Sequence, residues 1–214
     1  MPKIVDHDQR RDEIALVACR VVATHGFEQA TVVRIARAAG YTTGMLAHYF
    51  DSKQEIILAA LRLIMRRIEQ RLTRPSEEGI DLLTVLSESL PVDANRQIEC
   101  AFYMAFWGQV SADRRLKRIN AWVHREYLRL YQRCFERQWP EWSGWPAPIR
   151  DEVLRSMVTF INGLTASAVS SPGDWPAPRQ IDQLKLQLEM LHGWAMSQQK
   201  APKLRRGIAR LASS

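Results

Sequence analysis

The most constraining feature of the sequence is a pair of short helical segments that meet at a glycine. The segment "VVRIARAA" precedes Gly40, and the segment "YTTGMLAHYF" follows it. Ala36 lies four residues before Gly40, where a small side chain lets two helices approach closely and the glycine allows the turn between them. Four apolar side chains remain to fill a small core beneath the pair: Ile35, Ala39, Leu46 and Phe50. This spacing predicts a helix-turn-helix.

Helices are also predicted on both sides of this pair. Apolar residues at helical spacing between residues 14 and 22 predict a first helix, with Asp8 as a candidate N-cap and Gly26 as a stop. Ser52 and Glu55 form an S-x-x-E capping box, which opens a long fourth helix. Its apolar stripe consists of Ile57, Leu61, Ile64, Ile68 and Leu72.

The second short helix carries small and hydrogen-bonding side chains on the face opposite its apolar residues. In a helix-turn-helix this helix enters the major groove, where hydroxyl and imidazole groups reach base edges and methyl groups contact thymine. A helix that begins after Thr31 also offers free backbone N–H groups to a phosphate. The candidate DNA-binding residues are Thr31, Arg34, Thr42, Thr43, Gly44, Met45, His48, Tyr49 and Lys53.

Each of these residues also has a purely structural interpretation. Thr31 can be no more than a helix cap, Tyr49 a packing residue and Lys53 a solvated charge. The combination of two short helices, a glycine turn and a capping box is more specific than any single residue. The motif therefore carries the DNA-binding hypothesis, and the individual contacts follow from it.

The net charge of +7 is unevenly distributed along the chain. Residues 1–74 carry 12 Lys and Arg against 8 Asp and Glu, residues 75–199 carry 13 against 15, and residues 200–214 carry 5 against none. A basic N-terminal unit on a nearly neutral body favours a phosphate-binding head on a sensing body, although a solvated surface gives the same balance. The basic C-terminal tail is either a second phosphate-binding arm or a simple charged end.

The second half of the chain consists of long helical patterns, and the last one carries two apolar stripes. The segment "IECAFYMAFWGQV" is apolar nearly all round and predicts an enclosed helix. Two helices follow near the C-terminus, at about 148–170 and 178–199. A helix with two apolar faces needs two partners, so we expect a four-helix homodimer interface; a helix buried within a monomer is the alternative. The predicted interface residues are Val153, Met157, Ile161, Leu164, Leu184, Leu188 and Leu191.

Aromatic residues in the body suggest a cavity for a small molecule, with a few polar groups to orient it. The same aromatics at helical spacing can simply be core residues. Glu99 and His124 are further polar candidates beside the main set. The candidate ligand-binding residues are Phe102, Tyr103, Phe106, Trp107, Trp122, Phe160 and Asn162.

Several classes of protein are not indicated by the sequence. No nucleophile elbow, zinc-protease motif, P-loop or dinucleotide-binding glycine turn occurs, so an enzyme is not expected. Three distant cysteines show no metal or disulfide spacing, and neither a metal nor a cofactor is predicted. The mean hydropathy of -0.26, the short apolar runs and the charged start predict a cytoplasmic protein without a membrane partner.

The segment "TVVRIARAAGYTTGMLAHYFDSKQEII" resembles the DNA-binding signature of the TetR family of bacterial repressors, over roughly residues 8–72. Within it, "TTGMLAHYF" is most similar to the branch that contains the betaine-biosynthesis repressors. Ala47 stands where many members have Tyr, which shifts the expected contacts to His48 and Tyr49.

The resemblance implies an all-α fold, in which three N-terminal helices carry the helix-turn-helix and a long helix joins them to a ligand-binding and dimerisation body. It also implies a homodimer that binds a palindromic double-stranded operator and is released by a small-molecule effector of unknown identity. We therefore expect a DNA-binding domain at 1–52, a ligand-binding and dimerisation domain at 53–200 and a basic tail at 201–214. A ligand-independent or architectural DNA-binding protein, an activator and a helical enzyme remain as alternatives.

Overall fold

The structure, a computed structural model, describes residues 7–73 and 81–200, which contain nine α-helices, one 3-10 turn and no strand. This confirms the predicted all-α fold. The helices are α1 (His7–His25), α2 (Val32–Ala38), α3 (Thr43–Ala47), α4 (Lys53–Leu72), α5 (Leu82–Ser87), α6 (Ala94–Val110), α7 (Arg114–Gln138), α8 (Ala147–Ser170) and α9 (Ala177–Lys200), and the turn is η1 (Trp142–Gly144). The basic tail predicted at 201–214 lies outside the described residues.

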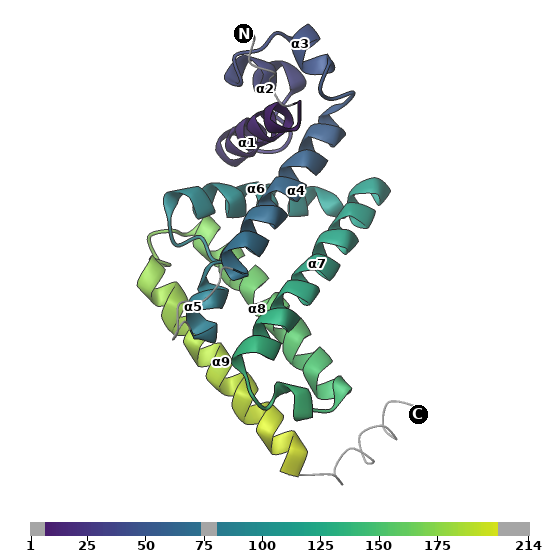
Figure 1. Cartoon of the computed structure of the whole chain (residues 1–214). Helices are drawn as coiled ribbons and strands as arrows, with labels where there is room; N and C mark the ends of the chain where they lie inside the picture. Colours follow the sequence, from purple (N-terminus) through teal and green to yellow (C-terminus); the bar gives the residue numbers. More distant parts are fainter. Residues whose placement is uncertain (1–6, 74–80, 201–214) are drawn as a thin grey trace, which may run out of the picture.

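The helices form an elongated molecule with a small head at one end (Figure 1). The head consists of α1, α2 and α3, and α4 runs from it into the body, where α5 to α9 pack around one another. Helix α1 packs against both α4 and α6, so the head rests on two helices that belong to different parts of the chain. Any shift of α4 relative to α6 therefore changes the position of the head on the body.

Glycines and side-chain caps set the helix boundaries in the head. Gly26 ends α1 with a φ of 79°, and Gly40 adopts a φ of 75° in the turn between α2 and α3, a left-handed conformation that glycine adopts without strain. The Thr31 hydroxyl accepts a hydrogen bond from the backbone N–H of Arg34 and caps α2 as predicted. Asp8 is not the N-cap of α1, because the helix already includes His7.

The capping box at the start of α4 differs from the predicted one in a single bond. The Ser52 hydroxyl accepts from the Glu55 backbone N–H at 3.3 Å. The Glu55 carboxylate, however, accepts from the backbone N–H of Asp51 at 3.0 Å, one residue earlier than a reciprocal capping box requires. The apolar stripe predicted along α4 is confirmed, because all five of its residues are buried.

Helix α6 is not enclosed, contrary to the sequence prediction. Phe102 and Phe106 are fully buried, but the Trp107 side chain is 41% exposed. Helix α6 packs on α1, α7 and α8, and its Glu99 pairs with α4, but these contacts leave Trp107 partly exposed. The apolar pattern overestimates burial here because it records residue type and not the presence of a neighbour.

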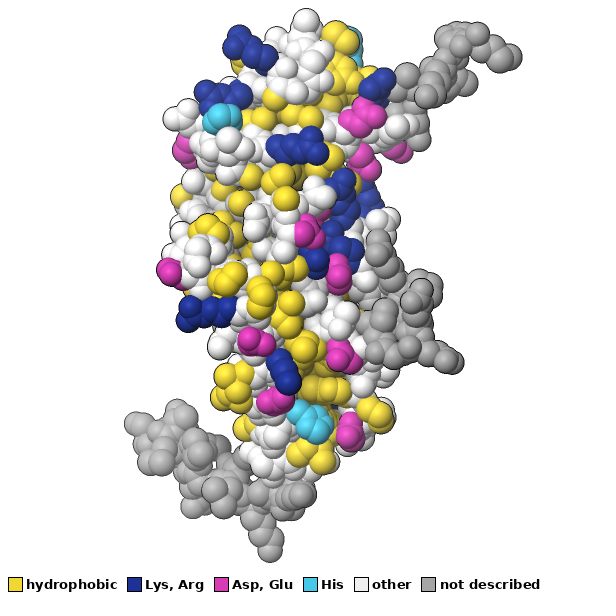
Figure 2. All heavy atoms as spheres, turned by 90° about the vertical axis from the view of Figure 1, so that its left-hand side faces the viewer, with side chains coloured by type: hydrophobic (Ala, Val, Ile, Leu, Met, Phe, Trp, Pro, Cys, Tyr) yellow, Lys and Arg dark blue, Asp and Glu magenta, His cyan; other side chains and the backbone are white. Residues whose placement is uncertain are grey.

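One apolar stripe of α9 faces its own chain and the other is exposed. Leu184 is fully buried and Leu188 is 8% exposed, whereas Leu186 is 48% exposed and Met190 is 61% exposed. Figure 2 looks onto the side of the molecule on which α9 lies and shows hydrophobic side chains running down the lower body, with charged side chains at their edges. No helix of the described residues is long and apolar enough to span a membrane.

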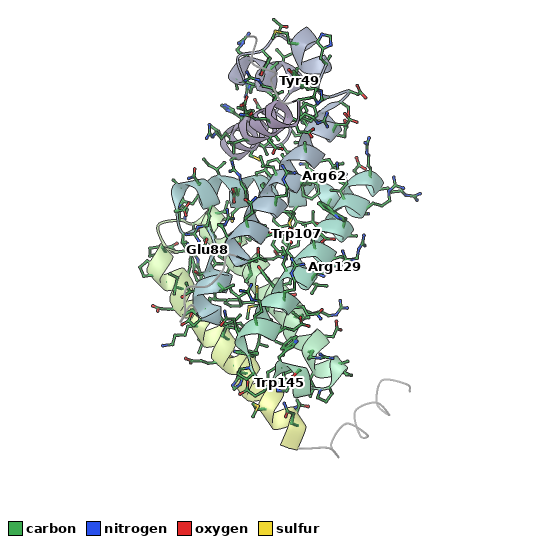
Figure 3. All side chains as sticks on the ribbon, in the orientation of Figure 1. Tyr49, Arg62, Glu88, Trp107, Arg129 and Trp145 are labelled. Carbon is green, nitrogen blue, oxygen red and sulfur yellow. The ribbon has the colours of Figure 1, made fainter. Side chains whose placement is uncertain are left out.

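Stacked aromatic residues close the end of the body that is farthest from the head. The Trp142 ring lies 4.9 Å from the Phe135 ring and 5.6 Å from the Trp145 ring, measured between centroids. His192 of α9 contacts Trp139 of this cluster at 5.0 Å. Figure 3 labels Trp145 at this end and Tyr49 in the head, at opposite ends of the molecule. The cluster anchors α9 to α7 far from the helix-turn-helix.

Candidate nucleic-acid interface and body pocket

Helix α3 is held from below by one apolar side chain and presents the rest of its surface to solvent. Leu46 is 1% exposed and anchors the helix in the core of the head. On the outer side, Met45 is 48% exposed, and Thr43 and His48 are also exposed. A helix of five residues with a single buried anchor contributes little to stability, so its outer side chains are available for a partner.

Two of the candidate DNA-binding threonines are helix caps. The Thr31 hydroxyl accepts from the Arg34 backbone N–H at 3.2 Å, and the Thr42 hydroxyl accepts from the Met45 backbone N–H at 3.1 Å. A threonine hydroxyl that accepts one bond still has its own proton to donate. Capping and phosphate binding are therefore compatible at both positions, and both side chains are exposed.

Tyr49 and Lys53 are more strongly engaged within the chain than a free phosphate contact requires. The Tyr49 ring is half-buried and lies 5.0 Å from the His7 ring and 6.1 Å from the Tyr41 ring. Lys53 Nζ donates to the backbone oxygen of Phe27 at 2.6 Å and lies 4.5 Å from the centre of its ring. Burial lowers the pKa of Lys53. Both side chains brace the junction between α4 and the head.

Sequence patterns did not single out two further residues of the head. Arg11 of α1 donates to the backbone oxygen of Tyr49 and lies 4.2 Å from the centre of the Phe50 ring, so it ties α1 to the segment after α3. Val33 on α2 is 57% exposed, which is unusual for an aliphatic side chain beside a small core. The helical period of α2 places Val33 on the outer face of the helix, beside Arg34, and this position could have been recognised from the sequence.

A small pocket lies in the body between α4, the end of α5, α6, α7 and α8. Its cavity volume is about 20 Å³, which is room for about one water molecule. Apolar and phenolic side chains and four charged residues share the lining. The lining residues are Ile64, Ile68, Arg71, Glu88, Ser89, Arg96, Glu99, Cys100, Tyr103, Tyr127, Ile161, Asn162 and Thr165.

The structure brings only part of the predicted ligand set to this pocket. Tyr103 and Asn162 line it, as does Glu99, which the sequence suggested as an additional polar group. Phe102 and Phe106 are core residues with no exposed surface. The others, Trp107, Trp122 and Phe160, do not line the pocket, and neither does His124. Arg71, Ser89 and Arg96 were missed because they come from separate segments of the chain and share no sequence spacing.

Ion pairs join the helices around the pocket. Glu99 of α6 is 5% exposed, and it accepts from Arg71 Nη2 at 2.8 Å and from Arg67 Nη1 at 3.2 Å, both on α4. Glu88, directly after α5, lies 3.1 Å from Arg96 Nη1 and 3.7 Å from Arg71 Nε. Removing one partner of such a buried pair leaves an uncompensated charge. The network therefore holds α4, α5 and α6 in one arrangement.

Two polar groups of the lining have no hydrogen-bond partner among the described residues. These groups are the Nε of Arg71 and the hydroxyl of Ser89, whose side chain is 8% exposed. Burial raises the pKa of Tyr103 to about 12 and raises that of Tyr127 well above its ordinary value. Both phenols are therefore neutral near pH 7. The pocket contains unused hydrogen-bonding capacity, which is costly to bury without a partner.

The seven residues predicted for the dimer interface lie inside the single chain. Val153, Met157, Ile161 and Leu164 of α8 are at most 5% exposed, and Leu184, Leu188 and Leu191 of α9 are at most 8% exposed. They pack against their own body, which leaves little of these side chains for a second copy to contact. The residues of α9 that a second copy can reach are on the other stripe, at Leu186 and Met190.

Comparison with known protein families accounts for both the head and the body. Residues 14–60 match the family model of the bacterial regulatory proteins of the tetR family, and residues 81–193 match that of the BetI-type transcriptional repressor C-terminal domain. The chain belongs to the TetR family. TetR-family proteins are DNA-binding transcriptional regulators and not enzymes, and they bind operators as dimers and respond to small-molecule effectors.

Curated members of the TetR family align over different lengths of this chain. The regulator BetI 1 of Chromohalobacter salexigens is 24% identical over 80% of this chain and 85% of its own length. BetI of Brucella anthropi is 33% identical over 56% of this chain and 66% of its own. PksA of Bacillus subtilis is 32% identical over 50% of this chain and 54% of its own length.

Solved structures of TetR-family regulators share the fold. A transcriptional regulator from Rhodococcus sp. RHA1 superposes with a TM-score of 0.74 at 24% identity, over 86% of this chain and 97% of that one. A regulator from Saccharomonospora viridis, solved in complex with choline, superposes with a TM-score of 0.67 at 17% identity, over 85% of this chain and 96% of that one. At these identities the likeness establishes the arrangement of the helices.

Proposed function

We propose that this TetR-family regulator is a cytoplasmic repressor that binds a palindromic operator as a homodimer and leaves it when a small effector enters the body pocket. We assign DNA binding to residues 1–52, and effector binding and dimerisation to residues 53–200. The single observation that carries the proposal is the placement of α3, which is anchored by Leu46 and exposes Thr43, Met45 and His48.

The chemistry of the α3 surface suits the major groove. Met45 and the Thr43 methyl group can contact thymine methyls, while His48 and the Thr43 hydroxyl can reach base edges. Thr31, Arg34 and the N-terminus of α2 are suited to hold a phosphate. In this proposal Tyr49 and Lys53 position α3 from behind rather than reading bases. Gly44 lets the backbone approach the DNA closely, and Thr42 caps the helix that reads it.

In a homodimer, the head of each copy binds one half-site of the operator. The exposed Leu186 and Met190 lie four residues apart on α9, on the same face, which is the spacing of a helix packing seam. The same patch on a second copy completes a two-fold interface of α8 and α9 with their counterparts. Two α3 helices about 34–36 Å apart then read two half-sites one helical turn apart.

Effector release follows from the position of the pocket. Arg71 on α4 and Glu99 on α6 form adjacent walls of the pocket, and α1 of the head rests on both of these helices. A ligand larger than one water molecule must widen the cavity of about 20 Å³ and move α4 against α6. The head then changes its tilt, so ligand and DNA each weaken the binding of the other.

Selection of a random duplex library by the purified protein tests the DNA-binding part of the proposal. We expect an enriched inverted repeat, whose affinity falls steeply with salt because phosphate contacts release counterions. Tight binding without an enriched repeat would instead support an architectural DNA-binding protein. A reporter gene placed behind the selected repeat distinguishes repression from activation, since a repressor lowers its expression.

A further inference from the structure

We infer that the body pocket takes a small organic acid, whose carboxylate binds the Nε–H of Arg71, which makes no hydrogen bond within the described chain, and the hydroxyl of Ser89. This inference rests on the proposed function only in treating the pocket as an effector site. The carboxylate chemistry comes from the unused groups of the lining and from the charge of the approach to it.

The unpartnered groups of the pocket need a hydrogen-bond acceptor. Arg71 Nε can only donate, and the Ser89 hydroxyl, 8% exposed, has the Tyr131 hydroxyl near it but makes no well-formed hydrogen bond to any described residue, so its proton can turn to a ligand. Both residues line the same cavity. A carboxylate has two oxygens and accepts from two donors at once, and hydrogen bonds between charged groups are the stronger kind. A single carboxylate on the ligand can therefore accept hydrogen bonds from both Arg71 and Ser89.

The acidic residues of the pocket, by contrast, are already paired. Glu99 accepts from Arg67 and Arg71. Glu88 lies within ion-pairing distance of Arg71 and Arg96. A cationic ligand would have to displace an arginine from one of these carboxylates and leave that arginine without its counter-charge. A carboxylate ligand meets an Arg71 Nε–H that makes no hydrogen bond with the described residues, because the Glu88 carboxylate lies 3.7 Å from it, beyond hydrogen-bonding distance.

The outer approach to the pocket is basic. A surface groove of about 370 Å³ between α1, α4 and α6 is lined by Arg20, Arg67 and Arg71, with Glu99 as its one acidic lining residue. Among the described residues, no carboxylate pairs with Arg20. Positive charge in a groove raises the local concentration of anions. The groove therefore favours the entry of acids over cations.

The ion pairs of Glu99 stand between the groove and the pocket. Arg71 and Glu99 line both the groove and the cavity, so the two spaces share this wall. An incoming carboxylate can pass from Arg67 in the groove to the Nε–H of Arg71 and then settle against Ser89. On this route Glu99 keeps its ion pairs with both arginines. A ligand larger than the cavity of about 20 Å³ then separates α4 from α6 as it enters.

The remaining lining sets the size and polarity of the acid. Ile64, Ile68 and Ile161 offer an apolar wall to a short hydrocarbon part. Tyr103 and Tyr127 add neutral phenols that can bond a hydroxyl or carbonyl elsewhere on the ligand. Because the cavity of about 20 Å³ has room for about one water molecule, even a short hydrocarbon part enters only as the helices separate.

Four molecules of nearly one shape test the charge preference on the full-length protein. They are 3,3-dimethylbutanoate, glycine betaine, 3,3-dimethylbutanol and choline, which carry a carboxylate, both charges, no charge and a cation in turn. A series from acetate to octanoate, each with its matching alcohol and primary amine, extends the comparison to other sizes. Binding is measured by calorimetry and by the shift in unfolding temperature, without DNA.

We expect at least one acid to bind about tenfold or more tightly than its matched alcohol and amine, because it gains a charge-assisted hydrogen bond. Ser89→Ala should weaken that acid about fivefold to tenfold and leave the matched alcohol nearly unchanged. Since the Ser89 hydroxyl makes no well-formed hydrogen bond among the described residues, this variant should fold normally. Arg71→Met should abolish the preference for acids, and Arg66→Met on the same helix, paired with exposed Asp12, is the matched control.

The inference is overturned if choline or the neutral alcohols bind as tightly as the acids, if no acid binds better than its counterparts, or if Ser89→Ala retains full acid affinity. Its failure can be separated from that of the proposed function. An acid that binds but leaves operator affinity unchanged supports the pocket chemistry and refutes effector release. A cation that binds and releases DNA supports effector release and refutes the acid.

Discussion

Glu99 of α6 accepts a hydrogen bond at 2.8 Å from the guanidinium of Arg71 on α4, and only 5% of the Glu99 side chain is exposed. Together with Arg67, this contact ties the helix that leads to the head to the helix on which the head rests. Because the Glu99 carboxylate is buried, its ion pair with Arg71 contributes more to the stability of the fold than the surface ion pairs of α4.

The first prediction concerns this ion pair. Glu99→Gln should lower the free energy of unfolding by about 2–3 kcal/mol, because Arg71 loses its buried counter-charge. Glu69→Gln is the matched control on α4, since Glu69 is 51% exposed and pairs with Arg133 at the surface, and it should cost less than about 1 kcal/mol. Urea unfolding of the three proteins measures both effects, and equal costs would contradict the structural role of the buried pair.

The second prediction concerns the outer face of α3. Thr43→Ala, Met45→Ala and His48→Ala should each weaken binding to the selected operator by about 1–3 kcal/mol, as expected for lost base contacts. Their unfolding temperatures should stay near that of the unchanged protein, because all three side chains are exposed. Fluorescence anisotropy with the operator duplex measures the affinity. Arg155→Ala, at the surface of α8, is a control that should not alter it.

The third prediction concerns the exposed stripe of α9. Leu186→Glu combined with Met190→Glu should convert the dimer to a monomer, because charges cannot be buried unpaired at a two-fold interface. Operator affinity should fall with it, since each monomer reads one half-site. Sedimentation velocity measures the mass. Arg129→Gln on α7 is a control whose position Figure 3 labels on the side away from α9, and it should leave the protein dimeric. A double variant that remains dimeric would place the interface elsewhere.

The fourth prediction compares two glycines. Gly40→Ala should lower the stability of the protein by about 1–2 kcal/mol, because an alanine at a φ of 75° is strained even though no atom lies within 4 Å of its Cβ. Gly108→Ala, inside α6 and also without a close neighbour, should raise stability by up to about 1 kcal/mol. Thermal unfolding distinguishes the two signs. A neutral Gly40→Ala would mean that the turn between α2 and α3 relaxes without strain.

The fifth prediction is a loss of stability at alkaline pH. Burial raises the pKa of Cys19 from 9.0 to about 12 and that of Tyr103 from 10.0 to about 12. Between pH 9 and 12 the unfolded chain holds fewer protons than the folded one, so stability falls as pH rises, by up to about 1.4 kcal/mol per pH unit for each group. The stabilising contribution of both protonated groups is fully present below pH 9. Cys19→Ala and Tyr103→Phe should each flatten this fall in urea titrations, and an unchanged slope in both would contradict it.

Local sequence patterns were sufficient to predict the head. Thr31 caps α2, Gly40 takes the left-handed turn and Leu46 is buried beneath α3, because caps, turns and helical periodicity depend on neighbours within a few residues. The same dependence on near neighbours explains why the internal contacts of Tyr49 and Lys53 were not predicted. Lys53 turns back to Phe27, a contact across 26 positions that no local pattern contains.

The body was decided by tertiary structure. Amphipathic periodicity predicted its helices, but it could not say which of the two stripes of α9 would face the chain, and the stripe chosen for the dimer proved to be buried. The pocket likewise collects Arg71, Ser89 and Tyr127 from three distant segments. A sequence by itself determines where helices begin, end and carry apolar faces, since these depend on short-range sterics and hydrogen bonds. Which faces meet depends on packing among remote helices, and only the folded chain settles that.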